Sequence, residues 1–135
     1  MDRDEVIERI LLAAEAIPPG QVLAYGDIAA IVGCGPRQVG SVMRTHGHQV
    51  PWWRVTSHSG DLARGLLARA RPMWAEEGIE IKPNGLGCRI AEYRADRDAV
   101  AAAVDEAFAA ELDQTAGELD QTQQDRTAGE PDPER

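Results

Sequence analysis

The chain has 135 residues and a formal net charge of −9 at pH 7, which suits one compact domain with an acidic appendage. It holds no apolar run of about 18 residues, which excludes a membrane-spanning helix. Its first residues lack the basic and apolar regions of a secretory signal, so we expect a cytoplasmic protein. The two cysteines, Cys34 and Cys88, have no metal-binding spacing, which predicts free thiols and neither a metal nor a cofactor.

The net charge is unevenly distributed. Residues 1–89 carry ten acidic and ten basic side chains, whereas residues 90–135 carry thirteen acidic and four basic ones and hold the entire −9. Residues 34–71 contain one acidic residue, Asp61, and six basic ones. All six are arginines: Arg37, Arg44, Arg54, Arg64, Arg69 and Arg71. Arginine favours bidentate contacts with phosphates and bases, so this segment predicts a nucleic-acid partner, although a solvated basic face has the same composition.

Three helices are predicted in the first third of the chain. They cover residues 2–16, 25–32 and 36–45, and a short extended piece precedes the second at residues 22–23. Gly35 permits the turn before the third helix, and Pro36 suits its first position. The open face of that helix carries Arg37, Ser41 and Arg44. This pattern predicts a helix-turn-helix, although helical hairpins of enzymes look alike.

The rest of the domain combines short helices with short strands. A helical stretch runs to Glu77, but Pro72 interrupts it and predicts two short helices. Residues 79–81 alternate as a short strand, and residues 88–93 are a candidate final strand. We therefore expect an α+β domain, mainly helical, that covers residues 1–95.

Two further segments are predicted after the domain. Residues 96–112 form an appended helix with Val100, Val104, Phe108 and Leu112 on a narrow apolar stripe. Residues 113–135 are acidic and lack the apolar pattern of a coiled coil, which predicts disorder. One hypothesis is that the acidic tail, residues 111–135, competes with DNA for the arginines and weakens non-specific binding.

Four motifs occur in order along the domain. They read Ile-Pro-Pro-Gly at residues 17–20, Tyr-Gly-Asp-Ile-Ala at 25–29, Arg-Gln-Val-Gly-Ser-Val-Met-Arg at 37–44 and Pro-Trp-Trp-Arg-Val at 51–55. Together they resemble the C-terminal domain of the O6-alkylguanine-DNA alkyltransferases over about residues 4–93, in the pattern of the alkyltransferase-like proteins. The family's active-site motif is Pro-Cys-His-Arg-Val, so Trp52 stands at the reactive cysteine and Trp53 at the histidine base. An indole is no nucleophile at neutral pH, and the exchange therefore predicts a binder without catalytic residues.

The resemblance implies a winged-helix-like fold and a DNA-repair function. A protein of this kind binds double-stranded DNA in the minor groove, flips O6-alkylguanine into a pocket and signals to nucleotide excision repair proteins. A monomer is expected. The alternatives are an active cysteine methyltransferase and a helix-turn-helix transcriptional regulator, which would prefer one operator and usually bind as a dimer.

The resemblance also assigns residues. The DNA-binding residues are Tyr25, Arg37, Gln38, Ser41 and Arg44. Among them, Arg37 is the finger that fills the space left by the flipped nucleotide, and Tyr25 presses on its phosphate. The lesion-pocket residues are Trp52, Trp53, Arg54, Ser59, Gly60 and Arg69. Core positions remain open alternatives for Tyr25 and Trp52, and a structural role within the motif is the alternative for Arg54. Arg71 falls near the place of the family's relay glutamate.

Overall fold

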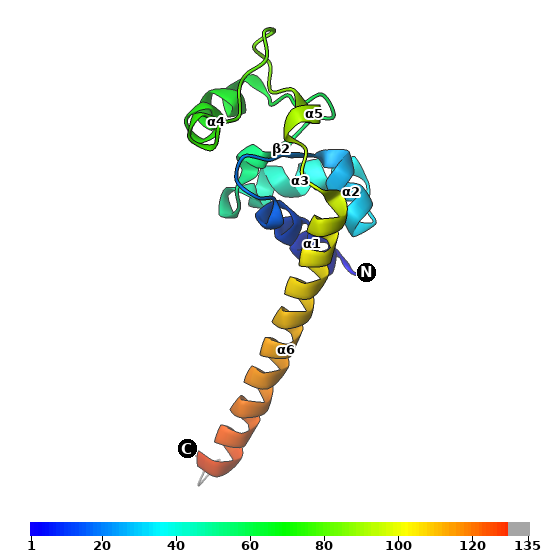
Figure 1. Ribbon diagram of the computed structural model, residues 1–135. Coiled ribbons are helices and arrows are strands. Elements are labelled where there is room, and N and C mark those ends of the chain that lie inside the picture. The colour runs from blue at the N-terminus through cyan, green and yellow to red at the C-terminus, as the bar shows by residue number, and fades with distance from the viewer. Residues whose placement is uncertain (130–135) are drawn as a thin grey trace.

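The computed structural model describes residues 1–129, with side chains described for residues 1–114 (Figure 1). Its elements are α1 (Arg3–Ala16), β1 (Leu23–Ala24), α2 (Tyr25–Val32), α3 (Pro36–His46), η1 (Gly47–Gln49), η2 (Trp52–Arg54), β2 (Val55–Thr56), α4 (Arg64–Glu77), α5 (Ile90–Tyr93) and α6 (Arg97–Gly129). The α+β, mainly helical class is confirmed. Over this part of the chain no helix combines the length and the apolar character needed to cross a membrane.

The first three helices surround the main hydrophobic core. The Asp2 carboxylate caps α1 by accepting a hydrogen bond from the Glu5 amide at 2.8 Å. Helix α1 then packs against both α2 and α3. Ile10 of α1, Ile28 of α2 and Val39 of α3 are fully buried, and each such side chain contributes roughly 1.5–3 kcal/mol. Helix α1 therefore fixes α2 and α3 relative to each other.

Helices α2 and α3 form the predicted helix-turn-helix. Gly33 ends α2 with φ at 90°, a left-handed conformation that glycine adopts without strain. Helix α3 begins at Pro36 as predicted and ends at His46, one residue later than predicted.

The two-stranded sheet connects this unit to the Pro-Trp-Trp-Arg-Val segment. Strands β1 and β2 are parallel, with Leu23 opposite Val55 and Ala24 opposite Thr56. Strand β1 leads directly into α2, and β2 directly follows η2. Because the strands are parallel, the start of α2 lies at the end of the sheet where β2 finishes, and η2 lies at the opposite end, beside the residues that precede β1.

A second hydrophobic cluster lies under α4. Leu67, Ala70 and Trp74 of α4 pack there with Val22 and Cys88. Trp74 is 1 % exposed, and its indole N–H donates a hydrogen bond to the Trp53 carbonyl at 2.7 Å. Helix α4 is thereby attached to the back of η2.

Three sequence predictions are corrected in this region. Helix α4 continues through Pro72 because Pro72 and Ala68 are exposed, so water can satisfy the Ala68 carbonyl that lacks a partner at position 72. Residues 79–81 make one isolated bridge, between Ile81 and Cys88, rather than a strand. The alternation there reflects burial in the second cluster. Residues 90–93 form helix α5, not a strand.

The first half of α6 packs on α1 and α2. Val100 and Val104 are buried there, and Asp96 caps the helix by accepting from the Asp98 amide at 2.9 Å. Arg94 and Arg97 both contact Asp27, at 3.2 Å and 3.4 Å. The predicted apolar stripe of the appended helix is thus a contact face at Val100 and Val104, whereas Leu112 at its end is exposed, contrary to the prediction.

Helix α6 then leaves the body on the side of α1, away from α4 (Figure 1). It continues to Gly129, so the predicted helix end at residue 112 and the disorder predicted for residues 113–129 differ from the structure. Residues 113–129 contain alanine, glutamate and glutamine, which favour helix, and no proline, which would interrupt it. Their intrinsic helix propensity is therefore compatible with a continued helix. The predicted disorder of residues 130–135 lies outside the described residues.

Candidate functional site

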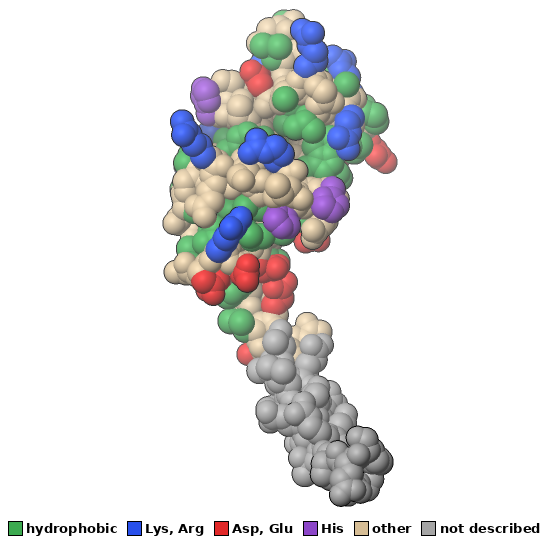
Figure 2. Space-filling view, turned by 180° about the vertical axis from the view of Figure 1, so that it is seen from behind, with side chains coloured by type: hydrophobic (Ala, Val, Ile, Leu, Met, Phe, Trp, Pro, Cys, Tyr) green, Lys and Arg blue, Asp and Glu red, His purple; other side chains and the backbone are tan. Residues whose placement is uncertain are grey.

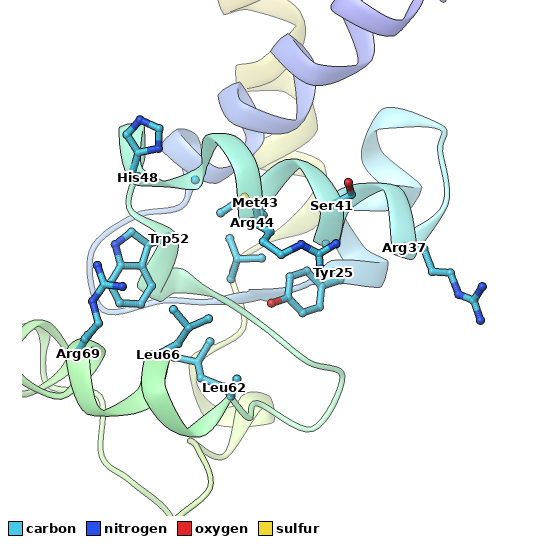
Figure 3. A pocket seen from close by; sticks show the side chains of 14 residues that line it. Tyr25, Arg37, Ser41, Met43, Arg44, His48, Trp52, Leu62, Leu66 and Arg69 are labelled. Carbon is cyan, nitrogen blue, oxygen red and sulfur yellow. The ribbon is translucent and has the colours of Figure 1, made fainter.

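A pocket of about 690 Å³ lies between α3 and α4 (Figure 3). Its lining comes from both helices, from η1 and η2 and from the start of α2. The lining residues are Tyr25, Arg37, Gly40, Ser41, Met43, Arg44, Gly47, His48, Trp52, Val55, Leu62, Ala63, Leu66 and Arg69. Six of the eleven predicted site residues are therefore brought together: Tyr25, Arg37, Ser41, Arg44, Trp52 and Arg69.

The pocket combines apolar walls with a basic rim. Trp52, Leu62, Leu66 and Met43 supply the walls, and Arg37, Arg44 and Arg69 are exposed around them. In Figure 2, Lys, Arg and His side chains surround hydrophobic surface on one face, whereas Asp and Glu side chains gather toward the end where α6 leaves. Among the described residues, these three arginines form no ion pair, which leaves them available to an anionic partner.

Trp52 lines the pocket and also packs against the second hydrophobic cluster. Its ring is half-buried, and the Arg69 guanidinium lies over it at 5.3 Å from the ring centre. A cation over an aromatic face is attracted by the ring quadrupole. Trp52 and Arg69 therefore make one composite wall of the pocket (Figure 3).

Tyr25 lies at the start of α2, beside Arg44 of α3 (Figure 3). Burial raises the pKa of the Tyr25 phenol above its ordinary value, although the charge of Arg44 opposes this rise. The hydroxyl consequently keeps its proton at neutral pH and can donate a hydrogen bond. Arg37 extends from the first turn of α3 toward solvent, and Gln38 beside it is exposed and does not line the pocket.

Trp53 and Arg54 lie behind the pocket, contrary to the prediction. The Trp53 indole N–H donates to Glu77 Oε2 at 2.8 Å, and Arg54 donates to both Glu77 carboxylate oxygens, at 2.7 Å and 3.1 Å. Arg54 also donates to the Ile17 carbonyl at 3.0 Å, and the Gly20 amide donates to Glu77 at 2.9 Å. These two residues thus support the pocket loop.

Glu77, and not Arg71, contacts the residue at the family's histidine position. Burial alone would raise the pKa of the Glu77 carboxyl, but hydrogen bonds from Arg54, Gly20 and Trp53 outweigh burial and lower this pKa. The carboxylate is ionised and fully engaged. Glu77 was missed because it follows Trp53 by 24 residues and nothing in the local sequence connects the two.

Ser59 and Gly60 do not line the pocket either. Gly60 adopts a positive φ of 83°, and a Cβ atom at this position would lie 2.2 Å from the Cys88 carbonyl oxygen. The loop thus lies directly against residues 87–88. Leu62 and Ala63, which follow the loop in the sequence, line the pocket where Ser59 and Gly60 were predicted. Leu62 and Leu66 were missed because apolar residues at a helix start look like core.

The two free cysteines do not provide an alternative nucleophile in the pocket. Neither Cys34 nor Cys88 lines it. Burial raises the pKa of both thiols, that of Cys88 to about 11, so both stay protonated at neutral pH. Within the described part of the chain, no group of three His, Cys, Asp or Glu side chains is placed to hold a metal ion.

Comparison with known proteins identifies one family. Residues 5–79 match the family model described as 6-O-methylguanine DNA methyltransferase, DNA binding domain. Alkyltransferase-like protein 1 of Schizosaccharomyces pombe is 36% identical over 96 residues, which are 64% of this chain and 88% of that protein. The DNA base-flipping protein of Escherichia coli is 34% identical over 88 residues, 61% of this chain and 68% of the relative.

Solved structures give the same result. The crystal structure of S. pombe Atl1 in complex with damaged DNA containing O6-carboxymethylguanine matches with a TM-score of 0.63 and 32% identity. The match covers 71% of this chain and 99% of that one. A second structure of the S. pombe protein with DNA matches with a TM-score of 0.61. The shared part therefore comprises nearly all of that protein and leaves over a quarter of this chain without a counterpart in it.

Proposed function

This chain belongs to the 6-O-methylguanine DNA methyltransferase family through its DNA-binding domain, and we propose that it detects O6-alkylguanine in duplex DNA without repairing the base. The observation that carries the proposal is Trp52 in the wall of a pocket with a basic rim. This tryptophan stands where the family has its acceptor cysteine. An indole can stack on an alkylated base but cannot take its alkyl group.

The basic rim supports binding to DNA in the minor groove. Arg37 and Arg44 lie on the open face of α3, and neither is paired among the described residues, so both can displace counterions from phosphates. The exposed Arg37 occupies the space left by a flipped nucleotide. The protonated hydroxyl of Tyr25 donates to the phosphate of that nucleotide. Gln38 and Ser41 complete the contact along the helix.

The pocket supports nucleotide flipping. Its volume of about 690 Å³ lies within the range of small-molecule sites. A flipped alkylguanine would lie between Trp52 with Arg69 on one side and Leu62 with Leu66 on the other. Because an alkylated guanine pairs weakly, flipping it costs less than flipping an undamaged one, which favours damage over sequence as the recognised feature.

Because no alkyl group is removed, another protein must act on the lesion. The proposed partners are nucleotide excision repair proteins that recognise the complex on DNA. The protein would act as a monomer on DNA in the cytoplasm.

The proposal is tested by titrating duplexes that differ in a single base. One duplex carries O6-methylguanine and the other is unmodified, at the same salt concentration, with tryptophan fluorescence as the readout. We expect tighter binding to the damaged duplex by about tenfold or more, which corresponds to about 1.4 kcal/mol. Equal affinities would contradict damage recognition and lead to a search for an operator sequence.

The absence of transfer is tested on the same mixture by mass spectrometry of the intact protein. We expect an unchanged protein mass after incubation with the methylated duplex. A gain of about 14 Da would mean that a side chain has accepted the methyl group and would contradict a binding-only function.

A further inference from the structure

The loop of residues 57–61 is a preformed turn. The Ser57 amide donates to the Asp61 carbonyl and the Gly60 amide to the Ser57 carbonyl, both at 2.9 Å. The Ser57 hydroxyl oxygen also accepts from the amides of Ser59 and Asp61, at 3.2 Å and 3.1 Å. The loop therefore keeps its own shape, and its position depends on its anchors to the rest of the domain.

Lys82 is the side-chain anchor of this loop. Its ammonium group donates to the Ser59 carbonyl at 2.7 Å and lies 2.6 Å from Asp61 Oδ1. Two backbone hydrogen bonds add to it, from Cys88 to the Gly60 carbonyl and from Leu62 to the Leu86 carbonyl. Lys82 thereby contacts the loop at two residues, Ser59 and Asp61.

The ion pair of Lys82 is largely withdrawn from solvent. The Lys82 side chain is 16% exposed and that of Asp61 30%, but the Oδ1 atom of Asp61 is itself buried. Among the described residues Oδ1 makes no hydrogen bond, and its charge is balanced by the Lys82 ammonium. Removing one member of such a pair leaves a buried carboxylate oxygen uncompensated. We therefore expect removal of the Lys82 charge to shift the loop, because the Asp61 carboxylate oxygen would otherwise stay buried without a counter-charge.

The position of the loop determines a wall of the pocket. Leu62 follows Asp61 directly, is 8% exposed and lines the pocket with Ala63 and Leu66 at the start of α4. A shift of Asp61 therefore reaches Leu62 through a single peptide bond. Val39 and Val42 of α3 pack in the other core cluster, so we expect this shift to leave the arginines of α3 in place.

We infer that Lys82 is a positioning residue that sets the width of the lesion pocket and thereby the preference for alkylated over normal guanine. This inference rests on the proposed function. Lys82 needs no contact with DNA for this role, because its ammonium is already engaged inside the protein. A substitution of Lys82 should therefore change the affinity only for duplexes whose flipped base occupies the pocket.

The test compares Lys82→Met and Lys82→Arg with the unchanged protein on the two duplexes of the titration above. Methionine keeps an apolar stem without the charge, and arginine keeps a cation. We expect Lys82→Met to lower the preference for the damaged duplex by about tenfold with unchanged affinity for the unmodified duplex, and Lys82→Arg to restore most of the preference. Arg9→Met is the matched control, since Arg9 pairs with Glu5 and Asp105 away from the pocket, and should leave the preference unchanged.

The possible outcomes separate this inference from the proposed function. An unchanged preference in Lys82→Met, while the original protein prefers the damaged duplex, overturns the role of Lys82 alone. A parallel loss for both duplexes with a weaker salt dependence would mean a phosphate contact and overturns it as well. If the original protein shows no preference, the proposed function fails and the inference fails with it.

Discussion

Trp52 and Trp53 are neighbours in the sequence, but their side chains serve different sides of η2. Their rings lie 5.8 Å apart at an angle of 86°. Trp52 faces the pocket under Arg69, whereas Trp53 donates a hydrogen bond to Glu77 behind it. The pocket wall and its support are thus divided between adjacent residues, and we expect a substitution of Trp52 to alter the pocket and a substitution of Trp53 to alter the support.

Glu77 is the residue whose loss should most affect this support. It accepts hydrogen bonds from Trp53, Arg54 and Gly20, and its side chain is 12% exposed. We expect Glu77→Gln to lower the free energy of unfolding by about 2 kcal/mol near neutral pH, because the Arg54 guanidinium then lacks its counter-charge. Urea unfolding followed by tryptophan fluorescence measures this change.

The effect of Glu77→Gln should depend on pH. The pKa of Glu77 is lower in the folded protein than its ordinary value of 4.5, so its ionised form stabilises the fold fully above this value. The contribution is lost as the pH falls through the folded pKa, so the two proteins should converge in stability only at a pH below that lowered pKa, and hence below 4.5. Glu8→Gln is the control: burial, together with Glu111 and Glu15, raises the pKa of Glu8, so loss of its charge should not destabilise. An equal loss in both variants would contradict the specific role of Glu77.

At the scale of elements, α6 is a structural part of the domain through its first turns. Val104 is 2% exposed against the core formed by α1 and α2, whereas Leu112 on the same helix is 57% exposed. We expect Val104→Ala to lower the free energy of unfolding by about 2 kcal/mol and Leu112→Ala to leave it unchanged. Thermal or urea unfolding of both variants checks this, and equal effects would mean that α6 is not docked as described.

Sequence reasoning succeeded for elements whose ends are encoded locally. Gly33 and Pro36 mark the turn between α2 and α3. The family motifs on these helices predicted Tyr25 and Arg44 as site residues, and both line the pocket. It failed where the outcome depends on distant partners. The direction of Trp53 depends on Glu77, which only the folded α4 brings near.

The end of α6 was misplaced for a related reason. Apolar periodicity detects the part of a helix that packs on a core, and here that part carries Val100 and Val104. The helix continues beyond it as an acidic segment without a packed face, a composition that also predicts disorder. Composition alone could not distinguish these two states.

At the scale of the whole molecule, basic and acidic side chains are concentrated at opposite ends of the described body (Figure 2). The arginines gather around the pocket, whereas acidic side chains gather where α6 leaves the body (Figure 2). Helix α6 then runs away from α4 (Figure 1). In the proposed complex the pocket face would meet the phosphates with positive charge and the acidic end would be repelled by them, which would favour approach with the pocket toward the DNA.

This arrangement argues against the hypothesis that the acidic tail competes with DNA. Residues 115–135 contain six acidic and two basic residues, and the helix that begins them is directed away from the arginines. Charges separated by more than about 8–10 Å are largely screened at physiological salt. We therefore expect a chain that ends at Gln114 to bind the unmodified duplex about as tightly as the full chain does at physiological salt. The two affinities should agree within about twofold. If the shortened chain binds undamaged DNA clearly more tightly, the tail must reach the arginine face, and α6 must bend or unfold beyond its packed turns to allow it.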